Sequence, residues 1–276
     1  MEYNVYFPNK QLKLGIKIWC EMFRDLFNAR ELVWRLFVRD WLARYKQSVL
    51  GVLWAVVMPF IAIGTFMYLN KAGVLNIAST GVPYPIYALI GLTVWQLFAT
   101  GINSGCMSLV SSGNIISKIN FPLEALVFSS VAQAIFEFMV KCCLIIAFFF
   151  AFHYRPTWGI VLFPVAVVPM LFFTMGLSLL LSLVNGVVRD TANVVTILST
   201  FLMFLTPVLY PISSERFLIF KLNILTPLVE APRDLIVRGH MTEPIDFFVA
   251  ATLSFLFFLM SWRIFYLAKT KIPERL

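Results

Sequence analysis

The sequence predicts an all-α integral membrane protein, in which six transmembrane helices follow an amphipathic helix that lies in the membrane interface. Three observations predict this class. Hydrophobic residues make up 60% of the chain and charged residues only 13%, whereas a soluble domain carries about 25% charged residues. The apolar residues form uncharged runs long enough to cross a bilayer. Most Lys and Arg residues fall between these runs on one side of the implied topology.

The chain divides into three predicted parts: a polar N-terminal segment over residues 1–16, the interface helix over residues 17–47, and the six-helix domain over residues 48–276. In the second part, apolar side chains and charged side chains fall on opposite arcs at 100° per residue, as in helices that lie along a membrane surface. The apolar arc holds Trp19, Met22, Phe23, Leu26, Phe27, Val33, Trp34, Phe37 and Trp41.

Six apolar runs follow, and each is long enough to cross about 30 Å of hydrocarbon as a helix. They lie near residues 49–69, 84–110, 125–152, 160–188, 191–210 and 247–267. With the N-terminus in the cytoplasm, fifteen of the 22 Lys and Arg residues lie inside and six outside. This bias predicts a multi-pass protein of the cytoplasmic (inner) membrane with both termini in the cytoplasm.

The segment from Pro211 to Pro244 is then extracytoplasmic, between the fifth and sixth spans. Its apolar and charged residues alternate as in short amphipathic helices that fold back into the outer leaflet. Thr226 and Pro227 are typical of the N-cap and first residue of a helix. Pro232 predicts a kink or two short pieces, and Gly239 a C-terminal stop.

Charge and cysteine content argue against other classes. The net charge of +8 is explained by cytoplasmic loops rather than by nucleic acid, because so apolar a chain leaves little basic surface for phosphate contacts. The four cysteines show neither the spacing of a zinc site nor that of a disulfide framework. A membrane enzyme with a metal would need clustered Asp, Glu or His, and the two histidines, His153 and His240, lie apart.

Glu137 and Lys141 lie four residues apart near the middle of the third span. Unpaired charges at this depth cost a few kcal/mol each, and this spacing lets the two side chains neutralise each other along one helix. Two interpretations stay open: a structural pair buried between helices, or a polar patch that faces a substrate path or a subunit interface.

Five motifs, in order along the chain, carry a family resemblance. Residues Arg39–Trp54 read RDWLARYKQSVLGVLW and are followed by Pro59. Four further motifs come later in the chain: Ser111–Pro122 (SSGNIISKINFP), Val188–Asp190 (VRD), Thr206–Pro211 (TPVLYP) and Leu222–Asp234 (LNILTPLVEAPRD). Over roughly residues 30–240, the chain resembles permease subunits of ABC-2 type polysaccharide exporters. It departs from the family pattern at Ile224, where proline is common, and at Pro232, where an aromatic or aliphatic residue is common.

The resemblance implies three groups of functional residues. Coupling to a nucleotide-binding subunit is implied for Asn114, Lys118, Phe121, Pro122, Arg189 and Asp190. A role at the interface helix and the start of the first span is implied for Trp34, Phe37, Arg39, Asp40, Arg44, Tyr45, Lys46, Ser48, Gly51 and Trp54. An outer gate is implied for Pro207, Tyr210, Pro211, Thr226, Pro227, Glu230, Arg233 and Asp234. Arg189 and Asp190 have a second interpretation, as a topology signal and a helix cap.

The resemblance also implies a homodimer that binds two copies of a separate ABC nucleotide-binding subunit. The chain has no Gly-x-x-x-x-Gly-Lys-Ser/Thr loop, so ATP and Mg²⁺ would be bound by that partner, and no catalytic, metal or cofactor site is expected here. The implied cargo is a lipid-linked polysaccharide: O-antigen, capsular polysaccharide or teichoic acid. The alternatives are an ABC-2 exporter of drugs or small lipids, and a passive channel. The 28 Phe, 7 Trp and 9 Tyr would supply a few aromatic side chains to line a glycan path.

Overall fold

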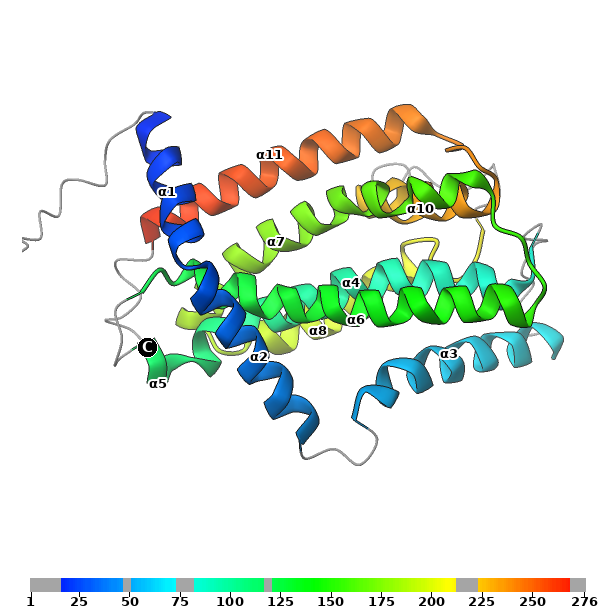
Figure 1. The fold of residues 1–276 in the computed structure, drawn as a ribbon, viewed down its shortest axis with the longest axis horizontal. Coiled ribbons are helices and arrows are strands. Elements are labelled where there is room, and N and C mark those ends of the chain that lie inside the picture. Colours follow the sequence, from blue (N-terminus) through cyan, green and yellow to red (C-terminus); the bar gives the residue numbers. More distant parts are fainter. Residues whose placement is uncertain (1–15, 47–50, 73–81, 117–120, 212–222, 269–276) are drawn as a thin grey trace, which may run out of the picture.

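The structure, a computed structural model, describes residues 16–46, 51–72, 82–116, 121–211 and 223–268 (Figure 1). Every regular element in these residues is a helix. The helices are α1 (Ile16–Asn28), α2 (Arg30–Lys46), α3 (Trp54–Lys71), α4 (Tyr84–Ser111), α5 (Gly113–Ile116), α6 (Glu124–Ala151), α7 (Phe163–Val187), α8 (Thr191–Phe204), α10 (Leu225–Val237) and α11 (Pro244–Ala268), with 3-10 turns η2 (Gly51–Leu53) and η3 (Trp158–Val161).

The described residues contain four helices that are long and apolar enough to cross a membrane, namely α4, α6, α7 and α11. Two of the predicted spans form helices that are shorter than these four. Helix α3 has 18 residues and α8 has 14, which correspond to about 27 Å and about 21 Å of helix. The prediction of a full span over residues 191–210 was wrong in length, because the helix ends at Phe204 and residues 205–210 form turns. Pro207 has no N–H with which to continue a helix.

The long helices run side by side, and their ends define two ends of the bundle (Figure 1). One end is called the α5 end. It holds α5, the C-terminal ends of α4, α7 and α11, and the first residues of α6 and α8. The opposite end, which holds η3 and α10, is called the α10 end. Helix α10 does not cross the bundle but packs against α4, α7, α11 and η3, and most of its side chains are buried.

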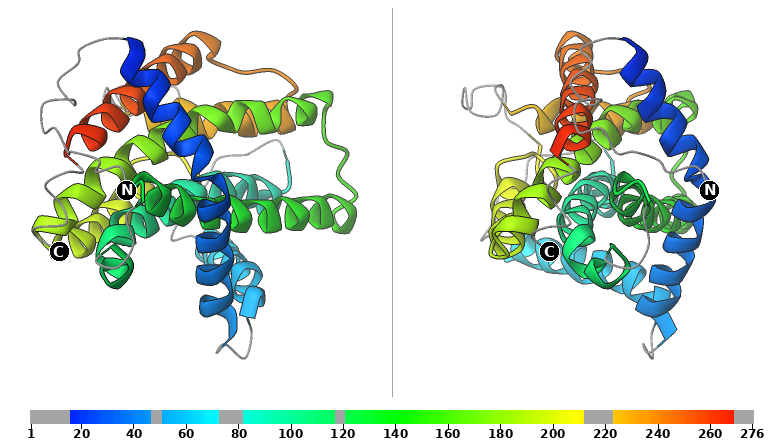
Figure 2. Two further views of the ribbon diagram at one scale, coloured as in Figure 1. Left: turned by 60° about the vertical axis from the view of Figure 1, so that its left-hand side comes forward. Right: turned by 90° about the vertical axis from the view of Figure 1, so that its left-hand side faces the viewer.

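The predicted single interface helix is two helices, which was not expected. The chain turns at Ala29, and α1 and α2 both run across the direction of the long helices at the α5 end (Figure 2). Each half has its own partner. In α1, Trp19 and Phe23 contact Trp262 of α11, with ring centroids 6.4 and 4.8 Å away. Apolar and polar side chains are segregated along α1 but mixed along α2, so the prediction of an amphipathic helix was correct only for the first half.

Helix α2 packs against α6, where Phe37 and Trp41 contact the ring of Phe136. A compact apolar cluster joins α1 and α2 to the long helices at the α5 end. Its buried members are Ile18, Met22, Leu36, Leu109, Leu123, Leu126, Val127, Leu179, Phe258, Trp262 and Phe265. The larger core cluster fills the rest of the bundle around α4.

Helices α4 and α7 approach closely because glycine faces small polar residues. A Cβ atom added at Gly101 would lie 2.4 Å from Cγ2 of Thr174, and one at Gly105 would lie 2.4 Å from Cβ of Ser178. The Ser178 hydroxyl donates a hydrogen bond to the carbonyl oxygen of Gly101 at 3.1 Å. Gly101 and Gly105 form a Gly-x-x-x-Gly motif, which lets two membrane helices approach at backbone distance.

We expect Gly105→Val to destabilise the protein by about 1–3 kcal/mol, because the added methyl groups have no space against Ser178. The matched control is Gly64→Val on α3, where a Cβ meets no atom within 4 Å. Both changes put the same β-branched residue into a helix, so intrinsic propensity cancels between them. Thermal unfolding in detergent measures the difference, and equal midpoints for the two variants would contradict the close contact.

Candidate functional site

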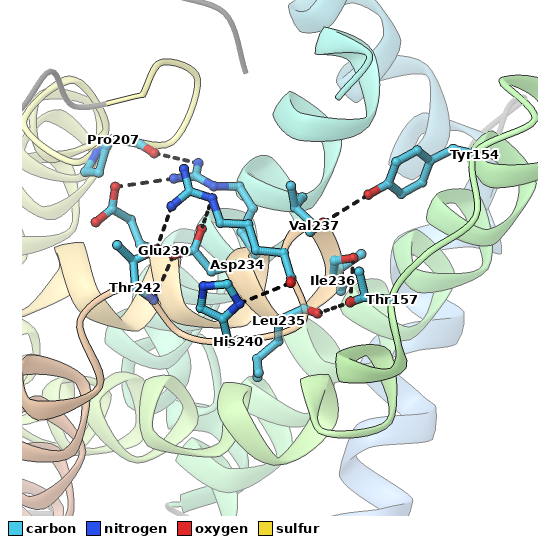
Figure 3. Close-up of polar contacts among 12 residues, drawn as sticks. Tyr154, Thr157, Pro207, Glu230, Asp234, Leu235, Ile236, Val237, His240 and Thr242 are labelled. Atoms are coloured by element: carbon cyan, nitrogen blue, oxygen red, sulfur yellow. Dashed lines mark hydrogen bonds and ion pairs between the residues drawn. The ribbon is translucent and has the colours of Figure 1, made fainter. Parts of the chain in front are cut away.

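A polar network at the α10 end includes Pro207 and Glu230 (Figure 3), and the side chain of Arg233 contacts both. Only 2% of this side chain is exposed. Its Nη1 donates hydrogen bonds to the carbonyl oxygens of Pro207 at 2.8 Å and Val208 at 3.3 Å. Its Nη2 lies 3.5 Å from Oε1 of Glu230, and the guanidinium carbon lies 4.0 Å from the ring centroid of Tyr87. One buried cation therefore joins α10, α4 and the segment after α8.

The segment after α8 requires such a donor. Residues 206–209 are buried without being helical, so their carbonyl groups lack the partners that a continuing helix would supply. Buried backbone polar groups without partners cost free energy, most of all where water is scarce. Arg233 supplies two hydrogen bonds, and Tyr84 donates a third, to the carbonyl oxygen of Leu209 at 3.1 Å.

Glycine at position 91 allows this segment to reach α4. A Cβ atom there would lie 2.2 Å from the carbonyl oxygen of Val208 and 3.3 Å from Nη1 of Arg233. Any larger residue would push the segment away from α4 and break the contact with the guanidinium group. Gly91 and Tyr87 were not predicted as site residues. A single glycine or tyrosine in an apolar span does not indicate a functional site in the sequence. Only the packing of α10 on α4 shows that these two residues belong to the site.

Glu230 is partly buried beside Arg233, and burial raises the pKa of its carboxyl group from 4.5 to about 7. Arg233 and Arg238 oppose this shift, whereas Asp234 and Glu243 add to it. Desolvation is the largest of these causes, so at neutral pH the carboxyl group exchanges between its neutral and charged forms.

We expect Glu230 to lower stability as pH rises from 4.5 to about 7. In this window the folded protein retains a proton that the unfolded chain has released, so the contribution of Glu230 to stability is most favourable below pH 4.5 and decreases towards about pH 7. The Glu230→Gln variant removes this contribution, so its thermal unfolding midpoint should change less with pH over the same window. All other titrating groups are common to both proteins. Parallel pH profiles for the variant and the unmodified chain would refute a protonated Glu230.

The C-terminal end of α10 is held by the loop before α7. The hydroxyl group of Thr157 donates hydrogen bonds to the carbonyl oxygens of Leu235 at 2.6 Å and Ile236 at 3.1 Å. The hydroxyl group of Tyr154 donates to the carbonyl oxygen of Val237 at 3.4 Å. These are carbonyl groups that a helix leaves unpaired at its end. The predicted stop at Gly239 is confirmed, since α10 ends at Val237 and Gly239 has a φ of +82°.

The N-terminal end of α10 differs from its prediction. Helix α10 begins at Leu225, so Thr226 lies inside it and is not the N-cap. The N-cap residue is Ile224, which makes no capping bond with its side chain. Beside it, Oδ1 of Asn223 accepts a hydrogen bond from the N–H of Leu225 at 3.0 Å, and Nδ2 of Asn223 donates to Oγ1 of Thr206 at 3.0 Å. Asn223 therefore joins the start of α10 to the segment after α8. Helix α10 continues through Pro232 as one helix, so two separate pieces were not found.

The structure brings together three of the eight predicted outer-gate residues. Pro207, Glu230 and Arg233 meet directly, and the hydroxyl group of Tyr210 donates to the carbonyl oxygen of Phe204. Asp234 is close enough to raise the pKa of Glu230, but it is bonded to residues outside the predicted set. It accepts a hydrogen bond from Thr242 and lies 3.9 Å from Nε of Arg238. Pro211 follows Tyr210, and Pro227 lies in the first turn of α10.

The predicted coupling residues gather at the α5 end. Asn114 lies on the short helix α5, and Phe121 packs with Ile115 and Ile116 against the cluster that holds α1 and α2. Pro122 precedes α6 in the same connection, and Lys118 lies outside the described residues. Arg189 and Asp190 are exposed between α7 and α8. Asp190 occupies the N-cap position of α8 without a hydrogen bond from its side chain, so the cap interpretation is not confirmed.

The residues predicted for the start of the first span are only partly described. Gly51, the first residue of η2, has a φ of +49°, a backbone conformation that favours glycine. Trp34 and Trp54 are exposed, and Phe37 contacts Trp34. Nε of Arg39 donates to Oδ1 of its neighbour Asp40 at 2.6 Å, and Lys46 is exposed. Ser48 and the side chains of Arg44 and Tyr45 lie outside the described residues.

The predicted charge pair is present in the third span. Nζ of Lys141 lies 3.6 Å from Oε2 of Glu137, and both side chains are largely buried. Lys141 shares a buried stripe of α6 with Ala134, Ile145 and Phe148. Ala134 faces Gly101 of α4, so this stripe lies against the neighbouring helix.

A model of the ABC-2 type transporter family matches residues 31–237, which is most of the chain. The chain belongs to this family. The matched region begins in α2 and ends at the last residue of α10. It therefore includes the Arg233 network, the α5 connection and the charge pair of α6, whereas α1 and α11 lie outside it.

Three relatives are similar over 73–82% of the chain. The O-antigen export system permease protein RfbA of Myxococcus xanthus is 30% identical over 226 residues, which cover 80% of this chain and 85% of that protein. A protein of the same name from Klebsiella pneumoniae is 29% identical over 209 residues, or 73% and 78% of the two chains. The polysialic acid transport protein KpsM of Escherichia coli is 21% identical over 234 residues, or 82% and 89%.

Proposed function

We propose that this chain is the transmembrane subunit of an ABC transporter that exports a lipid-linked polysaccharide, such as O-antigen, capsular polysaccharide or teichoic acid. The observation that carries the proposal is the similarity to the O-antigen export permease of Myxococcus xanthus over 80% of the chain. The second relative named for O-antigen export and the relative named for polysialic acid transport support the same class of cargo. A polymer cargo distinguishes this function from the export of drugs or small lipids.

The proposed exporter takes its energy from a separate subunit. The sequence has no phosphate-binding loop of the Walker type, so ATP and Mg²⁺ bind to a nucleotide-binding partner, two copies of which act on a homodimer of this chain. The α5 end faces the cytoplasm, in line with the excess of Lys and Arg there. The α10 end then faces outward, and both termini are cytoplasmic.

The packing at the α5 end suggests how the partner moves the bundle. Helix α5 is joined through Ile115, Ile116 and Phe121 to the apolar cluster that also holds Met22 of α1 and Leu36 of α2. Interiors packed in this way transmit displacement instead of absorbing it. A push on α5 from the nucleotide-binding subunit therefore reaches the interface helices and the ends of α4, α6, α7 and α11 together.

Deletion of the gene in its native host tests the cargo. Surface polysaccharide should be lost while polymer accumulates inside the cell, and the intact chain supplied from a plasmid should restore export. Normal surface polysaccharide in the deletion strain, with a changed resistance to drugs, would favour the alternative cargo.

We expect the partner subunit to contact α5. A cysteine in place of Asn114, in a background that lacks the four native cysteines, should crosslink to the nucleotide-binding subunit when the complex is purified from membranes. The matched control is a cysteine at Trp158, a residue that is 92% exposed at the α10 end, and it should not crosslink. Labelling of the Asn114→Cys variant by an impermeant reagent outside intact cells would reverse the proposed orientation.

A further inference from the structure

The segment after α8 is held to the bundle by side chains. Arg233 donates to the carbonyl oxygens of Pro207 and Val208, and Tyr84 of α4 donates to that of Leu209. Val208 and Leu209 are buried although this part of the chain is not helical. A segment without a helical ladder opens more easily than a regular element, because it depends on a few side-chain contacts. A change at one of these side chains therefore changes the hold on the whole segment.

The charge of Arg233 is balanced by Glu230. The arginine side chain is only 2% exposed, and its Nη2 lies 3.5 Å from Oε1 of Glu230. The carbonyl oxygens of Pro207 and Val208, which accept hydrogen bonds from Nη1, are neutral. A buried cation without a countercharge is costly. Glu230 therefore competes with the two carbonyl groups for one guanidinium group, and the strength of this competition depends on the charge of Glu230.

Glu230 is placed where its charge responds to pH. Its side chain is 29% exposed, so water reaches it, yet burial is the largest cause that raises its pKa to about 7. The titratable and charged groups that face it lie on α10, on α4 and just before α11: Tyr87, Arg233, Asp234, Arg238 and Glu243. Helix α7 and η3 also pack against α10 but contain no charged residue. Glu230 therefore changes its charge near neutral pH while it contacts the cation that holds the segment after α8.

We propose that a proton on Glu230 keeps the segment after α8 closed against α4 and α10, and that loss of this proton releases the segment. The proposal rests on the function proposed above, because it makes Glu230 a regulator of the outer end of the export path. An ionised carboxylate in a desolvated site is drawn towards water, and Arg233 follows its countercharge. The carbonyl groups of Pro207 and Val208 then lose their donor, and the segment loses its hold on α10.

The direction of the effect follows from proton binding. In the closed structure the pKa of Glu230 is about 7, compared with an ordinary value of 4.5. The closed state therefore binds the proton more tightly than an open state in which Glu230 is hydrated. Acid favours the closed state, and the ratio of open to closed protein rises by up to about tenfold for each pH unit between these two values. The outer end is closed in acid surroundings and released near neutral pH.

The packing makes this release a discrete step. A Cβ atom added at Gly91 would lie 2.2 Å from the carbonyl oxygen of Val208 and 3.3 Å from Nη1 of Arg233. The backbone of α4 is thus in direct contact with the segment after α8. Contacts packed in this way have two arrangements instead of a continuous range. The segment therefore separates from α4 as a unit, and its separation uncovers Leu209.

The accessibility of position 209 tests the proposal in the complete transporter. In a background without the native cysteines, Leu209→Cys places a thiol where the native side chain is 3% exposed. An impermeant thiol reagent is added outside right-side-out membrane vesicles. The labelling rate is divided by that of Trp158→Cys, a position that is 92% exposed at the same end, which corrects for the effect of pH on thiol reactivity. This ratio should rise about tenfold from about pH 5 to about pH 8.

Glu230→Gln is the matched variant, because glutamine keeps the shape of the side chain and does not ionise. In this background the labelling ratio should stay low at every pH. Two further variants change the charge around Glu230 without replacing it. Glu243→Gln should lower the pH at which the ratio rises, because Glu243 raises the pKa of Glu230. Arg238→Met should increase that pH, because Arg238 lowers the same pKa. A structural role for Glu230 predicts no such opposite shifts.

Either of two results would overturn the proposal. One is a labelling ratio that does not change with pH when Glu230 is present, and the other is an equal rise in the Glu230→Gln background. Should Glu230→Gln fail to accumulate in the membrane, unchanged transition pH values for Glu243→Gln and Arg238→Met overturn it equally. The proposed function fails separately, as unchanged surface polysaccharide in the deletion strain, because the labelling ratio does not depend on which cargo is exported.

Discussion

Replacing Arg233 by Met should abolish export and destabilise the protein by about 3–5 kcal/mol, because the buried acceptors that its guanidinium group serves are left without a donor. The carbonyl groups of Pro207 and Val208 lose their donors, and Tyr87 loses the cation above its ring. Such a loss is a large share of the roughly 5–15 kcal/mol that holds a protein folded. Yield and thermal unfolding in detergent measure the first effect, and surface polysaccharide measures the second.

Two further variants separate this role from a simple loss of charge. Arg238→Met removes an arginine on the same helix that is 53% exposed and lies 3.9 Å from Asp234, and it should cost less than about 1 kcal/mol. Arg233→Lys keeps the charge but loses the planar fork that reaches two acceptors at once, so it should rescue only in part. If Arg233→Met behaves like Arg238→Met, the guanidinium group does not hold the segment after α8.

Breaking the pair of Glu137 and Lys141 should have the second-largest effect. Glu137→Gln alone and Lys141→Met alone each leave a charge in the third span without its partner at 3.6 Å. We expect each to lower stability by about 2–4 kcal/mol. The double variant removes both charges and should recover most of the loss, which a double-mutant cycle of thermal unfolding measures directly.

Export by the double variant decides between the two interpretations of the pair. A stable and active double variant means that the pair is structural, as its place on the buried stripe of α6 suggests. A stable but inactive one means that the charges serve the conduit or its gating. Single variants as stable as the unmodified chain would show that the pair contributes nothing.

The sequence by itself determined the features that depend on local spacing and composition. The class of membrane protein follows from the apolar runs, and the charge pair follows from the four-residue spacing of Glu137 and Lys141. The stop at Gly239 follows from its freedom to adopt positive φ. Ordered motifs indicated the family, and they lie within the matched region. These features were predictable because each is encoded by residues close together in the chain.

Only the tertiary structure decided which sides of the helices meet. The spanning helices are apolar almost all round, so hydrophobic periodicity does not separate lipid-facing sides from packed ones. For this reason the close contact at Gly105 was not predicted, although the Gly-x-x-x-Gly spacing was present as a signal. The partners of Arg233 lie 25 and 26 positions away. Contacts between distant segments depend on how whole helices pack, which local sequence does not specify.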